Sequence, residues 1–539
     1  MEDFRVKAKI RSNGHSRKHC SERQASWQKE WQRRQERIQR RLDKQQREEG
    51  DGLSGEQPVL QGSNVHCQFS ERHCGTAYGG VAVMHQLVRE LGLAEAIDQR
   101  LELLKRHKPY HESDHVLNFA YNALCDGDCL DDMELRRTDE AYLDGLGAQR
   151  TPDPTTAGDF CRRFEEHDIR TLLEVCNETR LKVWQRQPQS FFAEAILDMD
   201  GTLVETSGEK KEGIDIAYDG TWGYHPLVLS LANTGEILSI VNRSGNRPSH
   251  EGAAAEADLA IELCRRAGFC RIRLRGDTDF TQTTHLDRWD MAGVKFVFGV
   301  DATIPRQIRA DDLPANAWRK LRRPARYTVK TQQRRKRDKV KERIVEERQF
   351  KNLRLVSEDV AEMEYRPTAC KKSYRLIVVR KNLERRDGQG QLFADYRYFF
   401  YVTNDRVATP EQVVFSANDR CDQENLHSQL KSGVCSLTTP VNTLLSNWAY
   451  MVMTSLAWNL KAWLALWPSA TGSDHEQTEQ RVEQHRVLRM EFKTFVNHLM
   501  RLPALVVHTG RRVLVRFVSW TPLQPLLFRV LESIGHRRC

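Results

Sequence analysis

The pattern of apolar and polar residues changes along the chain, and it is clearest between residues 190 and 300. Short apolar runs bounded by turn residues predict strands at 193–199, 226–232, 236–242, 270–275 and 294–300. Asn233-Thr234-Gly235, between the second and third runs, is typical of a tight hairpin turn. Helical spacing of apolar residues predicts helices at 251–267 and 281–292. The predicted order is strand, hairpin, helix, strand, helix, strand.

This order is that of a ribonuclease-H-like domain, an α/β fold whose first and fourth strands lie side by side in a mixed sheet. Basic segments rich in strand-forming residues follow at 326–330, 374–380 and 396–403, and they predict a strand-rich insertion. Helical spacing is also found at about 80–190 and from about Pro410 to the end. We therefore expect a ribonuclease-H-like mixed sheet with a strand-rich insertion, flanked by helical N- and C-terminal regions.

A chain of 539 residues is too long for one ordinary domain, and the changes of pattern suggest its boundaries. The expected parts are a basic helical arm and linker at 1–65, a helical region at 66–190, a ribonuclease-H-like domain at 191–304 and 405–440, a strand-rich basic insertion at 305–404, and a helical C-terminal region at 441–539.

The composition predicts a soluble chain with a real core, because 39% of the residues are apolar and 11 are tryptophan. The longest apolar stretch, Trp448 to Leu466, contains Asn459 and Lys461 and is therefore typical of a buried helix rather than a membrane span. The N-terminus has no apolar signal-peptide core, and the 13 cysteines are scattered. We expect a cytoplasmic protein with no membrane partner.

Positive charge is concentrated in two segments. Residues 1–50 hold 15 Lys/Arg and 8 Asp/Glu, whereas residues 319–351 hold 15 Lys/Arg and 4 Asp/Glu. The second segment is centred on Arg334, Arg335, Lys336 and Arg337. These segments carry more than the net charge of +9, so the remainder of the chain is mildly acidic. Two separate basic runs favour a polyanionic partner, with nucleic acid as the leading candidate.

Carboxylates follow two strands that should be neighbours in the sheet. Asp198 and Asp200 close the first predicted strand, where residues two apart share a face, and Asp277 and Asp279 follow the fourth. The predicted strand order brings Asp200 and Asp277 together at the strand ends. Because nearby carboxylates repel unless a cation lies between them, and Mg²⁺ prefers oxygen ligands, we expect a magnesium site here.

A third acid is expected from the helix that follows the insertion. Arg420, Glu424 and Lys431 fall at i, i+4 and i+11, which places all three on one stripe of a continuous helix. Three carboxylates of this kind suit phosphodiester chemistry, in which two Mg²⁺ ions about 3.5–4 Å apart assist the attacking and leaving oxygens.

The same residues permit a second interpretation. Asp198-Met-Asp200-Gly-Thr matches the opening motif of haloacid dehalogenase-like phosphatases, in which the first aspartate is the nucleophile and the second a general acid. Gly276-Asp277 also resembles the late metal-binding motif of that family. However, no lysine occurs between residues 212 and 293 to neutralise a phosphoaspartate, and a hairpin follows the motif directly.

The motifs resemble those of bacterial insertion-sequence DDE transposases. The matching residues are Asp200-Gly-Thr, Gly223 to Leu227, Gly276-Asp277 and the late helix. The most similar group carries Tyr-x₂-Arg-x₃-Glu-x₆-Lys, of which Arg420, Glu424 and Lys431 keep identity and spacing, whereas Ala417 stands at the tyrosine position. The resemblance covers about 190–440, with the insertion before the glutamate.

The resemblance implies a cut-and-paste enzyme in which Asp200, Asp277 and Glu424 are catalytic and bind Mg²⁺, with Mn²⁺ able to substitute. It implies that Arg420 and Lys431 contact phosphates, and that Trp318 is a candidate for holding a flipped base. The expected partners are double-stranded DNA, as terminal inverted repeats and target, and a second copy of the chain in a homodimeric synaptic complex. The resemblance also implies that the region 66–190 binds the DNA ends and that the ribonuclease-H-like domain is catalytic. It further implies a bacterial protein that is associated with the nucleoid when bound to DNA. A transposase-derived DNA-binding protein without catalysis is a further alternative, and the choice of Asp200 over Asp198 rests on the Asp-x-Thr match.

Overall fold

The computed structural model describes residues 28–43, 74–323, 352–386, 395–510 and 512–535. These residues divide into two compact units. Unit 1 combines the described parts of 1–187 with those of 429–539, and unit 2 is formed by Pro188–Ser428. Each unit is therefore considered by itself.

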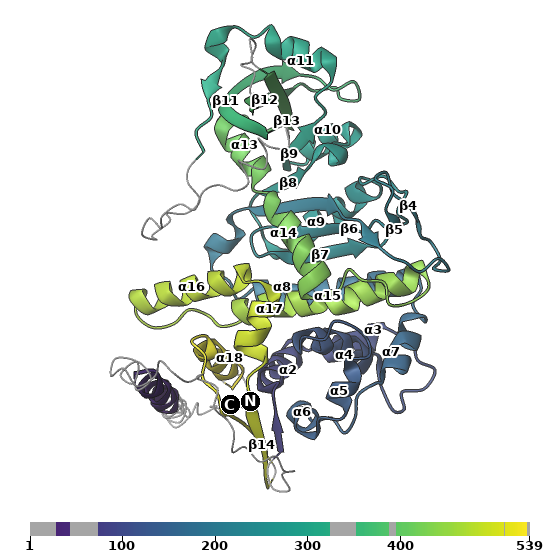
Figure 1. Ribbon diagram of the computed structural model, residues 1–539, viewed down its shortest axis with the longest axis vertical. Helices are drawn as coiled ribbons and strands as arrows, with labels where there is room; N and C mark the ends of the chain where they lie inside the picture. Colours follow the sequence, from purple (N-terminus) through teal and green to yellow (C-terminus); the bar gives the residue numbers. More distant parts are fainter. Residues whose placement is uncertain (1–27, 44–73, 324–351, 387–394, 511, 536–539) are drawn as a thin grey trace, which may run out of the picture. The chain divides into compact units, whose positions relative to one another are not determined.

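A mixed sheet forms the centre of unit 2 (Figure 1), and its core has the predicted strand order. Its first five strands in chain order are β2 (Ala195–Gly201), β6 (Leu227–Leu231), β7 (Glu236–Val241), β8 (Ile272–Gly276) and β9 (Lys295–Val300). β2, β6 and β7 are antiparallel neighbours, whereas β8 lies parallel to β2 and β9 lies parallel to β8. The expected ribonuclease-H-like arrangement, with the first and fourth long strands adjacent, is confirmed.

The insertion continues the same sheet instead of forming a separate one. β13 (Asp395–Thr403) pairs antiparallel with β9, and β12 (Tyr374–Arg386), β11 (Asn352–Tyr365) and β10 (Arg319–Lys320) follow outward. Nine strands are hydrogen-bonded side by side in the described part of the unit. The strand expected at 326–330 lies outside the described residues.

Helices cover both faces of this sheet. Among them, α9 (Ala253–Ala267) packs against β2, β6 and β8, whereas α13 (Pro410–Asn418) packs against β9 and the insertion strands. α14 (Cys421–Ser428) follows α13. Ser239 donates a hydrogen bond to Glu256 of α9, and Ser230 donates one to Gln423 of α14. Ser239 pairs with the residue that precedes Ser230 in β6. Consecutive side chains of a strand point to opposite faces of the sheet, so Ser239 and Ser230 lie on opposite faces, and so do the helices α9 and α14 that they contact.

The other elements of unit 2 are short. They comprise η1 (Gln189–Ala193), η2 (Thr278–Phe280), η3 (Ala315–Ala317), α10 (Thr283–Met291), α11 (Ile304–Asp311), and a small sheet of β3 (Val204–Glu205), β5 (Trp222–Tyr224) and β4 (Asp215–Ile216). The small sheet follows β2 directly, so it flanks the strand end that carries Asp200.

Unit 1 is mainly helical and is built around a long buried helix, α15 (Leu444–Leu466), which contacts α4, α8 and α16. Its other helices include α2 (Gly79–Leu91), α3 (Leu93–Arg100), α4 (Glu112–Leu124), α5 (Met133–Arg137), α6 (Glu140–Leu146), α7 (Pro154–Cys161), α8 (Glu166–Trp184), η4 (Gln429–Gly433), α16 (Asp474–Arg489), α17 (Phe492–Phe495), η5 (Val496–Met500) and α18 (Gln524–Gly535), and residues 28–43 are also helical. In α15, Lys461 donates to the carbonyls of Leu488 and Met490 at 3.1 and 2.6 Å, which explains how a lysine is accommodated there.

The C-terminal region is not helical throughout, contrary to the expectation for 441–539. β14 (Ala504–Thr509) and β15 (Arg512–Phe517) form an antiparallel hairpin, and β1 (Cys74–Thr76) pairs with β14. Valine-rich alternation in both segments favours extended backbone, since branched side chains pack well on a pleated surface.

Candidate active site

Asp200 lies near the end of β2 and is buried on the face that α14 covers. The Arg420 guanidinium donates to its Oδ2 at 2.9 Å, and the Gly201 backbone N–H donates to its Oδ1 at 3.0 Å. The side chain is thus held by one charged and one neutral donor.

Asp277 follows β8, the strand parallel to β2, and caps the short helix η2 by accepting the Asp279 N–H at 3.0 Å. Its Oδ2 lies 4.0 Å from Nη2 of Arg420. The guanidinium of Arg420 therefore contacts both aspartates, and the predicted convergence of Asp200 and Asp277 at adjacent strand ends is present in the structure.

Glu424 lies in α14, where its side chain is exposed. The preceding residue, Gln423, fixes the helix to the sheet because it is buried, accepts from Ser230 and donates to the Val228 carbonyl at 3.3 Å. The negative charge of Glu424 contributes to raising the pKa of Asp200, so the third acid lies within electrostatic reach of the first.

The carboxylates are in an environment that disfavours their charged forms. Burial, followed by the charges of Asp277 and Glu424, raises the pKa of Asp200 to about 7, although Arg420 and the Gly201 N–H act in the opposite direction. Burial also raises the pKa of Asp277 against the effect of Arg420. Carboxyl groups poised in this way release protons readily when a cation arrives.

Both oxygens of Asp198 are used in a buried ion pair. Arg275 of β8 donates from Nε to Oδ1 at 2.6 Å and from Nη2 to Oδ2 at 2.7 Å, and both side chains are at most 5% exposed. Arg275 also donates to the Ser416 carbonyl at 2.9 Å. A carboxylate engaged in this bidentate way has no oxygen available to attack a phosphate, so the geometry does not fit Asp198 as the phosphatase nucleophile.

A comparison with known protein families decides between the two interpretations of these motifs. The model of the family described as "Transposase DDE domain group 1" matches residues 57–539. The chain belongs to this DDE transposase family. The family implies an enzyme that cleaves and transfers DNA strands with the help of divalent metal ions.

Other comparisons add little to the family assignment. A solved structure described as the piggyBac transposase synaptic complex with hairpin DNA matches with a TM-score of 0.32 and 10% identity, covering 79% of this chain and 84% of that chain. A TM-score of this size does not establish a common fold. No curated protein sequence matches the chain significantly. In the part of this DDE transposase that the structure describes, no helix has the length and hydropathy of a membrane span.

The late helix of the transposase differs from the continuous helix expected for Arg420, Glu424 and Lys431. α13 ends at Asn418, Arg420 lies just before α14, and Gln429–Gly433 forms a π-helical turn. The angular step of 100° per residue therefore does not apply from 420 to 431, and the expected single stripe is wrong. Arg420 nevertheless reaches the aspartates, whereas Lys431 is exposed and belongs to unit 1.

Two histidines lie near Asp200. Sequence reasoning did not single out His427, and it placed His225 in the motif Gly223 to Leu227 without connecting it with Asp200. His427 is buried with Nδ1 4.0 Å from Asp200 Oδ2, and it lies three residues after Glu424 in α14. His225 is buried beside Gly201, so that a Cβ at Gly201 would lie 2.7 Å from its Nε2. The i, i+3 spacing from Glu424 was a sequence signal for His427. The position of His225 depends on strand pairing, which the sequence does not show directly.

Two other expectations concern an aromatic residue and the basic run. Trp318 is half-buried, and the Arg380 guanidinium lies 4.0 Å from its ring centroid, so one face of the indole is already covered. Arg334, Arg335, Lys336 and Arg337 lie outside the described residues.

The donor set of the transposase site fits hard divalent cations. Asp200, Asp277 and Glu424 supply only oxygen ligands, which Mg²⁺ and Mn²⁺ prefer. Burial raises the pKa of both aspartates more than the charge of Arg420 lowers it. A cation bound here would supply the missing positive charge.

Proposed function

We propose that the chain is the transposase of an insertion sequence, which binds terminal inverted repeats and uses Asp200, Asp277 and Glu424 to hold Mg²⁺, with Mn²⁺ able to substitute. The observation that carries this proposal is the position of Arg420, which contacts Asp200 at 2.9 Å and Asp277 at 4.0 Å. An arginine shared by two aspartates from parallel neighbouring strands supports the proposal that divalent cations bind at this place.

The side chains of the site have separate tasks in this proposal. Asp200 and Asp277 are fixed at strand ends by Gly201 and Asp279 backbone donors, so their oxygens are oriented before DNA arrives. Bound divalent cations would polarise the scissile phosphate and lower the pKa of the attacking oxygen. In the absence of DNA, Arg420 partly offsets the charges of the aspartates, and it contacts a DNA phosphate once cations have taken over that role.

Asp198 has a positioning role in the same proposal. Its bidentate pair with Arg275 joins β2 to β8, and Arg275 also binds the last turn of α13 through the Ser416 carbonyl. These bonds fix the strand ends that carry Asp200 and Asp277 relative to the helix that precedes Arg420. The pair therefore holds the three groups in register without touching the substrate.

Double-stranded DNA is the proposed partner, as both transposon end and target. The support is the family assignment together with two basic segments, 1–50 and 319–351, whose charges would neutralise phosphates. Arg334, Arg335, Lys336, Arg337 and Lys431 are proposed phosphate contacts, and residues 66–190 are the proposed end-binding region. Bringing two ends together requires two active sites, so we propose a homodimer in the synaptic complex.

The decisive experiment uses the full chain and a DNA duplex containing the inverted repeats that flank its reading frame. Asp200→Asn, Asp277→Asn and Glu424→Gln are expected to abolish Mg²⁺-dependent cleavage while retaining binding to the ends. Asp279→Asn is the matched control, because Asp279 lies in the same turn but is exposed and accepts a hydrogen bond from Ser249 at 2.9 Å.

The outcomes separate the alternatives. Cleavage by any one of the three variants at the parental rate would remove that residue from the catalytic set. Specific binding by the parent without cleavage in Mg²⁺ or Mn²⁺ would instead support a transposase-derived DNA-binding protein.

A further inference from the structure

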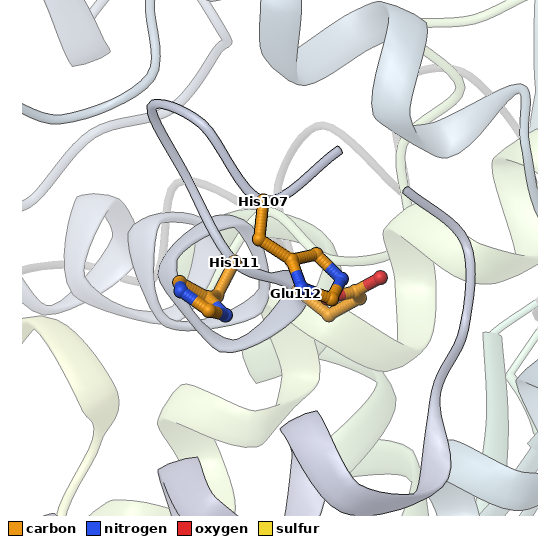
Figure 2. Close-up of side chains that lie close together, drawn as sticks. All are labelled: His107, His111 and Glu112. Atoms are coloured by element: carbon orange, nitrogen blue, oxygen red, sulfur yellow. The ribbon is translucent and has the colours of Figure 1, made fainter. Parts of the chain in front are cut away.

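The loop that leads into α4, in unit 1, brings two histidines and a glutamate together. His107, His111 and Glu112 each offer one ligand atom, and these atoms all lie within 4.8 Å of one another. Figure 2 shows the three side chains gathered where the loop joins the helix. This cluster lies outside unit 2, which contains the candidate catalytic acids.

The two carboxylate oxygens of Glu112 differ, because one accepts hydrogen bonds and the other has no hydrogen-bond donor in the described residues. Its side chain is 1% exposed, and Oε1 accepts the backbone N–H groups of Leu103 and Leu104 at 3.0 and 2.9 Å. Oε2 is buried and has no hydrogen-bond partner among the described residues. A buried carboxylate oxygen without a donor is costly, so this atom calls for a positive partner.

Oε2 of Glu112 points towards a nitrogen. His107 Nε2 lies 3.4 Å away, which agrees with the separation of about 3.3–3.4 Å between two ligands that are each about 2.0–2.1 Å from a tetrahedral zinc ion. The two imidazole rings are stacked with centroids 4.8 Å apart, and both histidines are exposed. The ligand atom of His111 lies within 4.8 Å of the other two, so a change in its side-chain torsions would be needed to bring it into the same coordination sphere.

The ligand chemistry distinguishes this cluster from the candidate catalytic site. Two imidazole nitrogens and one carboxylate suit zinc and similar transition metals, whereas Mg²⁺ prefers oxygen ligands alone. The hydrogen bonds from Leu103 and Leu104 orient the carboxylate in the way that metal ligands are commonly supported.

We propose that His107, His111 and Glu112 bind one zinc-class cation that fixes the loop 101–111 to the start of α4. The fourth ligand would be water, since His111 and His107 face solvent. Lys105, Arg106 and Lys108 are exposed in the same loop, so the bound cation also determines how three positive side chains are displayed. Asp114 does not compete as a ligand, because it accepts the His111 backbone N–H at 2.9 Å.

The test measures Zn²⁺ binding to the EDTA-treated full chain by calorimetry, in a background carrying Asp200→Asn and Asp277→Asn. His107→Asn and Glu112→Gln are each expected to lose one equivalent of Zn²⁺ or to bind it at least about tenfold more weakly. Glu112→Gln retains an oxygen for Leu103 and Leu104, so it should leave the fold intact, which circular dichroism checks.

His475→Asn is the matched control. His475 Nδ1 lies 3.8 Å from Glu479 in an exposed helical pair. This pair belongs to no three-ligand group in the described residues. The control should bind Zn²⁺ as the background protein does. Zn²⁺ should also slow trypsin cleavage after Lys105 and Arg106 in the background protein, but not in His107→Asn.

Two results would overturn the proposal. One is an unchanged Zn²⁺ stoichiometry and affinity in both His107→Asn and Glu112→Gln. The other is a background protein that binds no Zn²⁺ at all, which would leave His107 and Glu112 as an ion pair only.

Discussion

Arg420 donates a hydrogen bond at 2.9 Å to Asp200, a residue 220 positions earlier in the chain. The same guanidinium approaches Asp277 at 4.0 Å, so one cationic side chain serves two acids from neighbouring strands. This relationship places Arg420 in competition with any divalent cation that the aspartates bind, and it gives the site a defined state without DNA.

Replacing Arg420 by methionine should separate these two roles. At pH 8.5 the variant should bind Mn²⁺ several-fold more tightly without DNA, because the loss of the competing charge outweighs the further rise in the pKa of Asp200 that follows when Arg420 is removed. Cleavage of transposon ends should nevertheless fall by about tenfold or more, a loss of about 1.4 kcal/mol in phosphate binding. Manganese titration followed by electron paramagnetic resonance measures the first effect. Weaker Mn²⁺ binding by the variant at this pH would show that Arg420 supports the cations instead of competing with them.

Metal affinity should depend on pH through Asp200. Its pKa of about 7 means that the carboxyl is protonated below neutrality and must release the proton when a cation binds. The apparent Mn²⁺ affinity should therefore rise by about tenfold per pH unit below 7 and level off above it. Isothermal titration between pH 5.5 and 8.5 measures this slope. This pH dependence of the Mn²⁺ affinity should remain in Asp279→Asn and disappear in Asp200→Asn. An equally steep slope in Asp200→Asn would assign the titration to another group.

The stability of the metal-free protein should respond to the same group. Because the pKa of Asp200 is raised from its ordinary value of 3.8 to about 7, the folded state holds the proton more tightly than the unfolded state. The resulting stabilisation is complete below pH 3.8 and is lost as the pH rises through 7. Asp200→Asn should therefore raise the melting temperature by several degrees at pH 8 in EDTA, with a smaller difference at pH 5. Equal melting temperatures of variant and parent at pH 8 would contradict the prediction.

The buried pair of Asp198 and Arg275 should be essential to the fold and not to the chemistry. Asp198→Ala leaves a buried guanidinium without its partner, which should cost about 3–5 kcal/mol in the free energy of unfolding. A second substitution, Arg275→Met, should restore part of this loss. Urea denaturation measures both, with Asp301→Ala at an exposed position as the control. A double variant less stable than Asp198→Ala would show that Arg275 stabilises the fold through other partners.

The core of the fold could be predicted because its signals are local. The apolar runs, the Asn233-Thr-Gly235 turn and Gly268 at the end of α9 each determine a nearby element, and their order restricts the sheet. The convergence of Asp200 and Asp277 followed from that order alone. These predictions needed no knowledge of side-chain packing.

Other features could not be predicted because they depend on pairing between distant segments. The bond between Asp198 and Arg275 requires the register of β2 against β8, in which these two residues are partners. The helix break at Arg420 and the π-helical turn at Gln429–Gly433 leave no periodic signal in the sequence. The cluster at Glu112 depends on how the preceding loop folds back through the backbone of Leu103 and Leu104.

The pairing of β13 with β9 has a mechanical consequence. Gly299 of β9 lies opposite Tyr401 of the insertion, and on its other side a Cβ would lie 2.8 Å from the Thr278 nitrogen, next to Asp277. Thr281 also donates to the Gly299 carbonyl. One residue of β9 thus contacts both the insertion and the loop that bears the second acid, so a shift of the insertion strands would be expected to displace that loop as well.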